Sequence, residues 1–232
     1  MLKSLWRAFC YTLLLTLIAL ALVQFWFFIH IWYWVDHNPE STAFMEARLE
    51  RLREKNPQAV LRRQWVAYGR ISVNLKRAVI VAEDAKFLEH DGFDWEGIQK
   101  AYEKNLQKGK IVSGGSTISQ QLAKNLFLSG ERTWWRKAQE AVITVMLETI
   151  MTKRRILEIY LNVIEWGNAV FGAEAATHYH FGIAAANLSA EQAAQLAAMV
   201  PSPRRYKPGS ETPYLRKRTE IILSRMNSAT VP

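Results

Sequence analysis

The sequence of 232 residues contains a single cysteine, Cys10. An intrachain disulfide is therefore excluded, and cysteine usage does not indicate the compartment. Internal repeats and low-complexity tracts are absent as well. Two patterns that carry serine nucleophiles, Gly-x-Ser-x-Gly and Ser-x-x-Lys, do not occur, so a serine acyl-transfer site is unsupported.

Charge is missing from one long stretch near the N-terminus. No Lys, Arg, Asp or Glu occurs between residues 8 and 35, and about 20 apolar residues are enough to cross a bilayer. Aromatic residues gather at the far end of this stretch, between residues 26 and 34, as in the aromatic belts of membrane helices. Because Lys3 and Arg7 precede the stretch, the positive-inside rule predicts a cytoplasmic N-terminus.

Two other interpretations of this stretch compete with a membrane span. A signal peptide is possible because Ala19-Leu20-Ala21 offers a small-x-small cleavage pattern. Cleavage there would leave a strongly apolar new end over residues 22–26, which favours the uncleaved anchor. A buried core helix is disfavoured by the length of the stretch.

Strand signals are few beyond the polar hinge at residues 36–41, whereas helix signals recur. Two capping boxes are present, Thr117 with Gln120 and Ser189 with Gln192. Asn74 and Asp94 are further predicted N-caps, and Gly109 is a predicted helix end. The predicted helices span residues 44–56, 75–84, 95–107, 118–125, 134–151, 154–164 and 190–199. Beyond the anchor, the chain is therefore predicted to form one domain of the mainly α class.

A first group of chemically active residues runs from Glu83 to Gly92. Glu83 ends an apolar helical stretch, where lost hydration raises the pKa of a carboxyl toward the range of a general base. The competing interpretation is an ordinary acidic residue at a helix end, and the residues alone leave the two open.

A second group runs from Gly114 to Asn125. Glycines before a helix leave backbone N–H groups open to an anion, and Lys124 adds a positive charge. This pattern suits a phosphate-bearing ligand, and the overall net charge of +9 also favours anionic partners. A capped amphipathic helix after a flexible turn explains the same residues equally well.

Two further groups follow in the chain. Arg132, Arg136, Lys137 and Glu140 form either a surface ion-pair cluster or a carboxylate that positions cations around a charged substrate. In residues 153–162, apolar side chains repeat at helical spacing, which favours core packing.

Taken in this order and spacing, the groups resemble the peptidoglycan glycosyltransferases of glycosyltransferase family 51. Similar segments cover residues 83–92, 115–125, 136–140, 153–162 and 188–208. Glu165-Trp166-Gly167 and the short stretch after residue 208 resemble the monofunctional branch of that family. The divisions expected from this resemblance are a cytoplasmic end (1–7), a transmembrane helix (8–35), a membrane-proximal linker and helix (36–71), a glycosyltransferase domain (72–208) and a C-terminal tail (209–232).

The resemblance implies a lysozyme-like α fold that polymerises lipid II with inversion at the anomeric carbon. It makes Glu83 the general base, with Glu140 as a second catalytic carboxylate. Substrate binding is expected from Ser116, Thr117, Gln120, Gln121, Lys124, Asn125, Arg132, Arg136 and Lys137. No cofactor is required, although a divalent cation such as Mg or Mn can assist at the pyrophosphate. The expected partners are lipid II, the growing strand, the bilayer and cell-division or elongation proteins, with no nucleic acid.

Several alternatives stay open at this point. A lysozyme or lytic transglycosylase also uses carboxylates, but it has no need of cations for a pyrophosphate. A non-enzymatic membrane scaffold is the second alternative. His178-x-His180 lacks evident partner ligands and is interpreted as incidental, so no metal site is predicted. The apolar residues between 126 and 135 fit either ordinary core or partial immersion in the bilayer.

Overall fold

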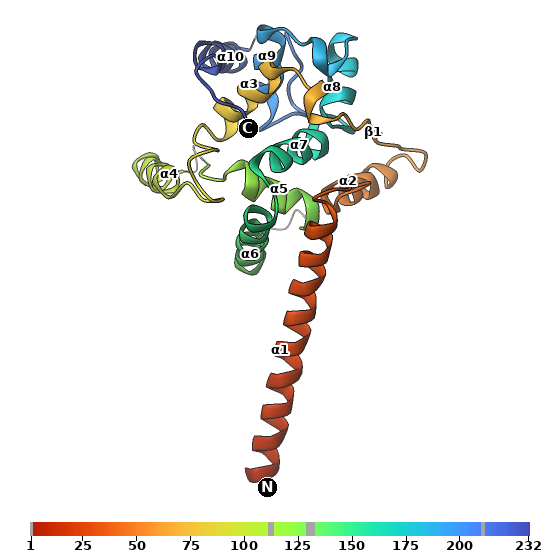
Figure 1. Cartoon of the computed structure of the whole chain (residues 1–232), viewed down its shortest axis with the longest axis vertical. Helices are drawn as coiled ribbons and strands as arrows, with labels where there is room; N and C mark the ends of the chain where they lie inside the picture. The colour runs from red at the N-terminus through yellow and green to blue at the C-terminus, as the bar shows by residue number, and fades with distance from the viewer. Residues whose placement is uncertain (1, 111–113, 129–132, 210–211) are drawn as a thin grey trace.

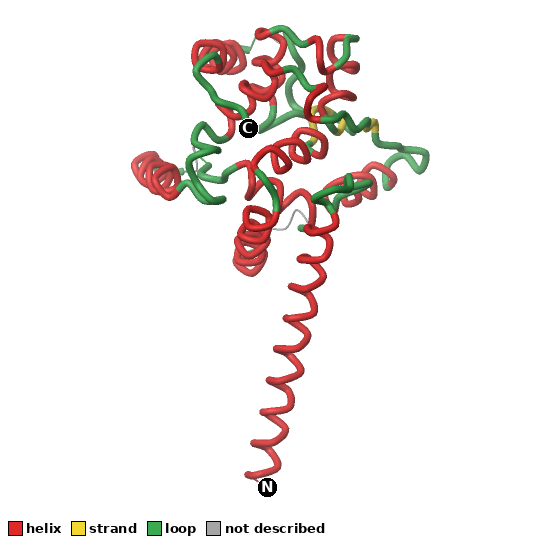
Figure 2. Tube along the Cα trace, in the orientation of Figure 1, coloured by secondary structure: helices red, strands yellow, loops and turns green. Residues whose placement is uncertain are grey.

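The structure is a computed structural model that describes residues 2–110, 114–128, 133–209 and 212–232. Its described part is mainly helical, as predicted, and Figure 2 shows short strands at one side of a helical body. The helices are α1 (Leu2–Tyr33), α2 (Ala43–Arg53), α3 (Val73–Glu83), α4 (Trp95–Lys108), α5 (Ile118–Phe127), α6 (Trp134–Ile150), α7 (Lys153–Val163), α8 (Ala173–Phe181), α9 (Ala190–Met199) and α10 (Pro213–Met226). Two 3-10 turns cover Tyr68–Arg70 and Ala185–Asn187.

Within the described residues there are three strands, β1 (Arg62–Arg63), β2 (Glu165–Gly167) and β3 (Val170–Phe171). They form one small sheet in the order β1-β3-β2. β1 runs parallel to β3, with Arg62 opposite Val170, and β2 runs antiparallel to β3, with Glu165 opposite Phe171. The sheet is small, yet β2 and β3 are buried and contribute Trp166, Val170 and Phe171 to the core.

Helix α1 projects from the rest of the molecule, with the N-terminus at its far end (Figure 1). Among the described residues, one helix is long and apolar enough to cross a membrane, and it is this one, over Lys3–Tyr33. Its most apolar window has a mean hydropathy of 2.3 and is 6% buried. The helix begins earlier than the predicted residue 8, because Lys3 and Arg7 extend it rather than precede it.

The structure confirms most of the predicted helix caps and corrects one of them. Both capping boxes form, at the starts of α5 and α9. Asp94 caps α4, and Gly109 ends that helix in the left-handed conformation. Helix α3, however, is capped by Ser72 rather than Asn74, because the Asn74 side chain donates instead to the carbonyl of Leu188 at 3.0 Å.

Two helices were not predicted, α8 and α10. The segment 209–232 had been expected as a tail, but Thr212 caps α10 and Pro213 occupies its first turn. Its apolar face packs on α3 and α9 and buries Leu215, Ile222 and Met226. These residues recur at a helical spacing, but basic residues lie between them and weaken the apolar pattern.

The helices form two groups that meet at the end of α3. In the first, α9 packs on α3, and four fully or almost fully buried alanines allow the two backbones to approach closely: Ala193, Ala194, Ala197 and Ala198. In the second, α5 packs against α6 and α7. Figure 1 shows the first group at the top of the domain and the second group toward α1. Glu83, the last residue of α3, therefore lies where the two groups meet.

Candidate active site

Glu83 is held at two points in the interior of the domain. Its side chain is only 10% exposed. Gln121 of α5 donates from Nε2 to Glu83 Oε2 at 2.9 Å, and Arg218 of α10 donates from Nη2 to Glu83 Oε1 at 3.1 Å. The predicted base is thus a buried, oriented carboxylate and not a solvated helix end.

Opposing influences act on the protonation of this carboxyl. Burial raises the pKa of Glu83, because the charged form loses hydration. The hydrogen bond from Gln121 and the positive charges of Arg218 and Lys124 act in the opposite direction but do not cancel the effect. The result is a pKa above the usual glutamate value, which suits a group that accepts a proton during a reaction.

A buried tyrosine extends this network. Tyr160 of α7 donates from its hydroxyl to Gln121 Oε1 at 2.8 Å. Its side chain is fully buried, and burial together with the nearby Glu83 and Asp84 raises the pKa of the phenol, so it stays protonated and can only donate here. The acceptor position of Gln121 is thereby fixed, and its amide N–H is directed to Glu83.

The other members of the first sequence group hold the backbone around Glu83. Asp84 accepts the backbone N–H of Ile118 at 2.9 Å and contacts His90 Nε2 at 3.0 Å. Lys153 donates to the His90 carbonyl at 2.6 Å. Gly92 has φ of +93°, and a Cβ there would lie 2.8 Å from the Thr144 side chain. These contacts join the ends of α3 and α7 to the start of α5.

At the start of α5, the side chains of two predicted binding residues form hydrogen bonds within the protein. The Thr117 hydroxyl donates to the Gly92 carbonyl at 2.7 Å and also caps the helix. Gln120 accepts the Thr117 N–H at 3.1 Å. Ser116, by contrast, is exposed. A cavity of about 190 Å³ brings Glu83 together with Asp94, Gly115, Ser116 and Thr117.

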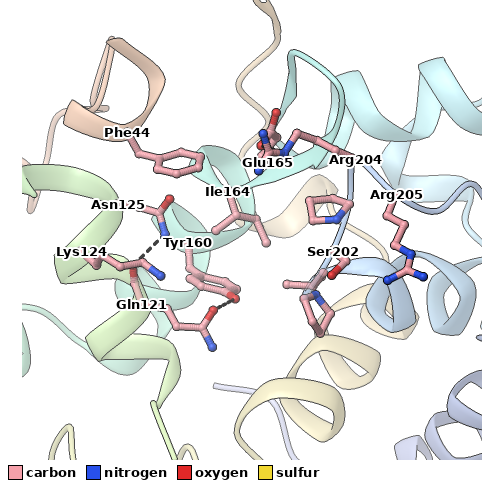
Figure 3. A pocket seen from close by; sticks show the side chains of 13 residues that line it. Phe44, Gln121, Lys124, Asn125, Tyr160, Ile164, Glu165, Ser202, Arg204 and Arg205 are labelled. Atoms are coloured by element: carbon pink, nitrogen blue, oxygen red, sulfur yellow. Dashed lines mark hydrogen bonds and ion pairs between the residues drawn. The ribbon is translucent and has the colours of Figure 1, made fainter. Parts of the chain in front are cut away.

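A larger cavity of about 500 Å³ lies on the other side of Gln121. Its described lining residues are Phe44, Gln121, Lys124, Asn125, Tyr160, Ile164, Glu165, Val200, Pro201, Ser202, Pro203, Arg204 and Arg205. Figure 3 shows Gln121, Lys124 and Asn125 on one side of it, facing Ser202 and Arg205 on the other. Gln121 lines this cavity and donates to Glu83, which lines the smaller one, so this hydrogen bond links residues of the two linings.

The third sequence group lies apart from both linings. Glu140 is buried in α6 and is paired with Arg136 Nη1 at 3.2 Å and with Lys137 Nζ. Among the described residues that line the two cavities, none comes from α6. Arg132, predicted for the same site, lies outside the described residues.

Sequence reasoning did not find Arg218, which contacts the carboxylate of Glu83 directly. The signal that could have found it is the basic run Arg216-Lys217-Arg218 within a helical pattern. One member of such a run faces inward by the 3.6-residue period.

The two histidines of the His178-x-His180 pair bind different groups. His178 contacts Glu174 at 3.1 Å, and His180 contacts the Trp166 carbonyl at 2.9 Å. Within the described ranges there is no cluster of three or more His, Cys, Asp or Glu side chains that could hold a metal ion.

Comparison with known proteins supports one family. The sequence model of the family described as Transglycosylase matches residues 49–227. The biosynthetic peptidoglycan transglycosylase of Nitrosospira multiformis is 63% identical over 227 residues, which cover 98% of this chain and 97% of the relative. That of Methylobacillus flagellatus is 61% identical over 233 residues and the full length of both chains. That of Laribacter hongkongensis is 63% identical over 217 residues, 93% of this chain and 95% of the relative. The chain therefore belongs to the transglycosylase family, as a glycosyltransferase of peptidoglycan synthesis with a lysozyme-like domain.

Proposed function

We propose that the protein polymerises lipid II and that Glu83 is the general base of this transfer. The observation that carries the proposal is the buried carboxylate of Glu83, which lines the smaller cavity and is oriented at 2.9 Å by Gln121 of the larger cavity. A base with this environment typically contributes about 10²–10⁴-fold to a rate.

In the proposed step, the 4-hydroxyl of an N-acetylglucosamine attacks the anomeric carbon of the donor N-acetylmuramic acid. The bond from that carbon to the pyrophosphate oxygen breaks, and its electron pair leaves with undecaprenyl pyrophosphate. Glu83 takes the proton of the attacking hydroxyl. A single displacement of this kind turns the α-linked donor into a β-1,4 product.

The two cavities support separate positions for the two sugars. A base must lie within hydrogen-bond reach of the proton it removes, so the acceptor belongs in the cavity that Glu83 and Ser116 line. The donor belongs in the larger cavity, where Lys124 can neutralise developing charge on the leaving pyrophosphate. Gln121 and Asn125 supply amide groups for the oxygens of the donor.

The cations of α6 are assigned a supporting role in this proposal. Arg136 and Lys137 share one buried carboxylate, Glu140, which fixes both of them in position. We propose that they attract the pyrophosphate together with Arg132 and that Glu140 acts by holding them. A divalent ion, if it assists, would arrive with the pyrophosphate rather than reside on protein ligands.

The long apolar helix α1 supports a membrane location for this chemistry. We propose that α1 crosses the cytoplasmic membrane with its N-terminus inside, so that the domain faces the outer leaflet. The exposed side chains of Trp134 and Trp135, 92% and 67% exposed, lie at the start of α6, which packs beside α1. Aromatic residues in such a place are suited to the bilayer interface. In the apolar segment 126–135, by contrast, Leu126 and Leu128 are buried in the core.

The experiment that tests the proposed function uses purified full-length protein, detergent and labelled lipid II. We expect glycan polymers to form and undecaprenyl pyrophosphate to be released. The same protein incubated with purified sacculi should release no soluble fragments. Fragment release without polymerisation would instead support the lytic alternative.

The role of Lys124 is tested separately in the same assay. We expect Lys124→Ala to lower the rate by about 10²–10³-fold, the usual loss for one group that stabilises developing charge. Lys104→Ala is the matched control, because Lys104 is an exposed lysine of α4. Equal rates for the two variants would remove Lys124 from the pyrophosphate site.

A further inference from the structure

Arg218 approaches Glu83 from a helix that lies outside all the sequence groups with predicted chemistry. Its Nη2 lies 3.1 Å from Glu83 Oε1 and 3.1 Å from the backbone carbonyl oxygen of Ala82. The Arg218 side chain is 28% exposed and the Glu83 side chain 10%. One nitrogen of the guanidinium group is therefore bound to two acceptors on the last turn of α3, and most of the ion pair is removed from solvent.

The second oxygen of the same carboxylate has a different donor. Gln121 donates to Oε2 at 2.9 Å, and Gln121 is itself fixed by the Tyr160 hydroxyl. A carboxylate oxygen can accept two hydrogen bonds. Among the described residues, each oxygen of Glu83 thus has one side-chain donor, and the two donors together fix the rotation of the carboxylate.

We propose that Arg218 is a positioning residue for glycosyl transfer, which keeps Glu83 ionised and oriented while the acceptor hydroxyl approaches. The proposal rests on the assignment of Glu83 as the base. Arg218 acts through Glu83, since the guanidinium group stays protonated throughout and neither gives nor takes the transferred proton. In the transfer step Glu83 gains one proton and becomes neutral, and the Arg218 N–H continues to donate to Oε1.

The charges around Glu83 explain why a direct cation is needed. Burial raises the pKa of Glu83, whereas Arg218 and Lys124 lower it. Lys124 also faces the donor cavity, so a bound pyrophosphate would share its charge. Arg218 would then be the cation that remains paired with the carboxylate.

The other titratable groups near Glu83 do not replace this cation. Tyr160 of α7 is neutral, and Asp84 and Asp94 are acidic side chains near Glu83. Helix α9, which also packs on α3, carries one titratable side chain, Glu191, and this group lines a separate cavity between α9 and α10. Acidic neighbours favour the protonated form of Glu83, which opposes its use as a base.

The test is the pH dependence of lipid II polymerisation by the wild type, Arg218→Gln and Arg218→Lys. An opposite charge at this distance lowers the pKa of a carboxyl by about one to three units. On the acid side of the profile of rate against pH, the rate falls as Glu83 is protonated, and we call this part the acid limb. We therefore expect the acid limb of Arg218→Gln to lie about one to three pH units higher than that of the wild type. Much of the lost rate should be recovered at a pH above this limb. For Arg218→Lys we expect a smaller upward displacement, because an ammonium group retains the charge but not the planar geometry.

Arg216→Gln is the matched control. Arg216 lies two residues away on the same helix, is exposed and lines the separate cavity, and its replacement removes the same charge. We expect its acid limb to coincide with that of the wild type. An equal displacement in Arg216→Gln would assign the effect to net charge and overturn the proposal.

A rate for Arg218→Gln that falls equally at every pH, with the limb unmoved, would show a purely structural role and would also overturn it. If circular dichroism shows that Arg218→Gln does not fold, Arg218→Lys decides the question, and an unmoved limb in that variant counts against the proposal. These outcomes are distinct from failure of the proposed function, which would appear as no polymerisation by the wild type or full activity of Glu83→Gln.

Discussion

At the residue scale, the environment of Glu83 determines when it can act as a base. Its carboxyl is buried at the end of α3, and burial raises the pKa. Gln121, Arg218 and Lys124 limit this rise and orient the group. A base of this kind binds a proton more readily than a solvated glutamate.

This environment predicts the pH dependence of the wild-type enzyme. The base works when ionised, so activity should be present above the raised pKa and lost as the pH falls through it. We expect the acid limb of kcat/KM to have its midpoint above 4.5, the usual value for a glutamate. A limb centred at or below that value would show that burial does not control this carboxyl.

The tyrosine behind Gln121 gives a second prediction. Tyr160→Phe removes the hydroxyl that donates at 2.8 Å but keeps the ring in the core. We expect kcat to fall by a few-fold to about tenfold, since one hydrogen bond contributes about 0.5–1.5 kcal/mol net. Tyr214→Phe, at an exposed position of α10, is the control and should leave kcat unchanged. An unaltered kcat in Tyr160→Phe would remove this hydroxyl from the orientation of the base.

The sequence predicted some of these residues and not others, for a physical reason. Glu83 and Lys124 stand within contiguous groups whose composition indicates chemistry, and each of them lines a cavity in the structure. Arg218 lies 135 residues from Glu83 in the chain, and no local pattern indicates which basic residue of its run turns inward. Thr117 and Gln120 form the predicted capping box at the start of α5. This box accounts for their hydrogen bonds within the protein, and their role as substrate ligands stays a prediction.

At the element scale, α10 carries Arg218 to the base and completes the packing on α3. The pattern that predicted α5 and α9 came from capping boxes next to strongly apolar residues. Helix α10 has a cap as well, but its three buried side chains stand among many charged ones. Tertiary packing, and not local preference, therefore determines this helix.

Substitutions on α10 test whether it belongs to the folded domain. Ile222 is 2% exposed, and Ile222→Ala should lower the free energy of unfolding by about 2–5 kcal/mol. Its neighbour Ile221 is 41% exposed, so Ile221→Ala serves as the matched control and should change stability little. Denaturant unfolding of both variants in detergent measures the difference, and equal stability would show that α10 is dispensable to the fold.

The C-terminal part of α1 also belongs to the domain. Phe27 and Ile31 are buried, and the rings of Trp26, Phe27 and Trp34 contact Phe127 at centroid distances of 5.9, 5.0 and 5.2 Å. Gln24 and Gln139 of α6 exchange amide hydrogen bonds at 3.1 and 3.4 Å. The anchor is therefore packed against α5 and α6 and is more than a tether.

Two truncations separate these roles of α1. Removal of residues 2–22 should weaken membrane association but leave the melting temperature in detergent and the activity on solubilised lipid II close to those of the full chain. Removal of residues 2–35 also deletes Phe27 and Ile31, which pack in the core, so its melting temperature should fall by several degrees. Equal melting temperatures for the two truncations would mean that the packing of α1 on the domain contributes no stability.

At the scale of the whole molecule, the arrangement relates the base to the membrane. Figure 1 shows α6 and α5 on the side of the domain nearest α1, with α3, α9 and α10 beyond them. Glu83 lies at the end of α3 in the lining of the smaller cavity with Ser116, and its partner Gln121 lines the larger cavity with Lys124. Under the proposed function and orientation, a lipid-linked substrate in the outer leaflet would reach this junction from the side of α1.

The most direct test of the central claim compares wild-type protein and Glu83→Gln on labelled lipid II at neutral pH. Glutamine keeps the size of the side chain but cannot take the proton of the acceptor hydroxyl. We predict glycan polymer from the wild type and a loss of at least about 10²-fold in Glu83→Gln, with circular dichroism showing the same helical content for both. Polymerisation at the wild-type rate by a folded Glu83→Gln protein would contradict the account.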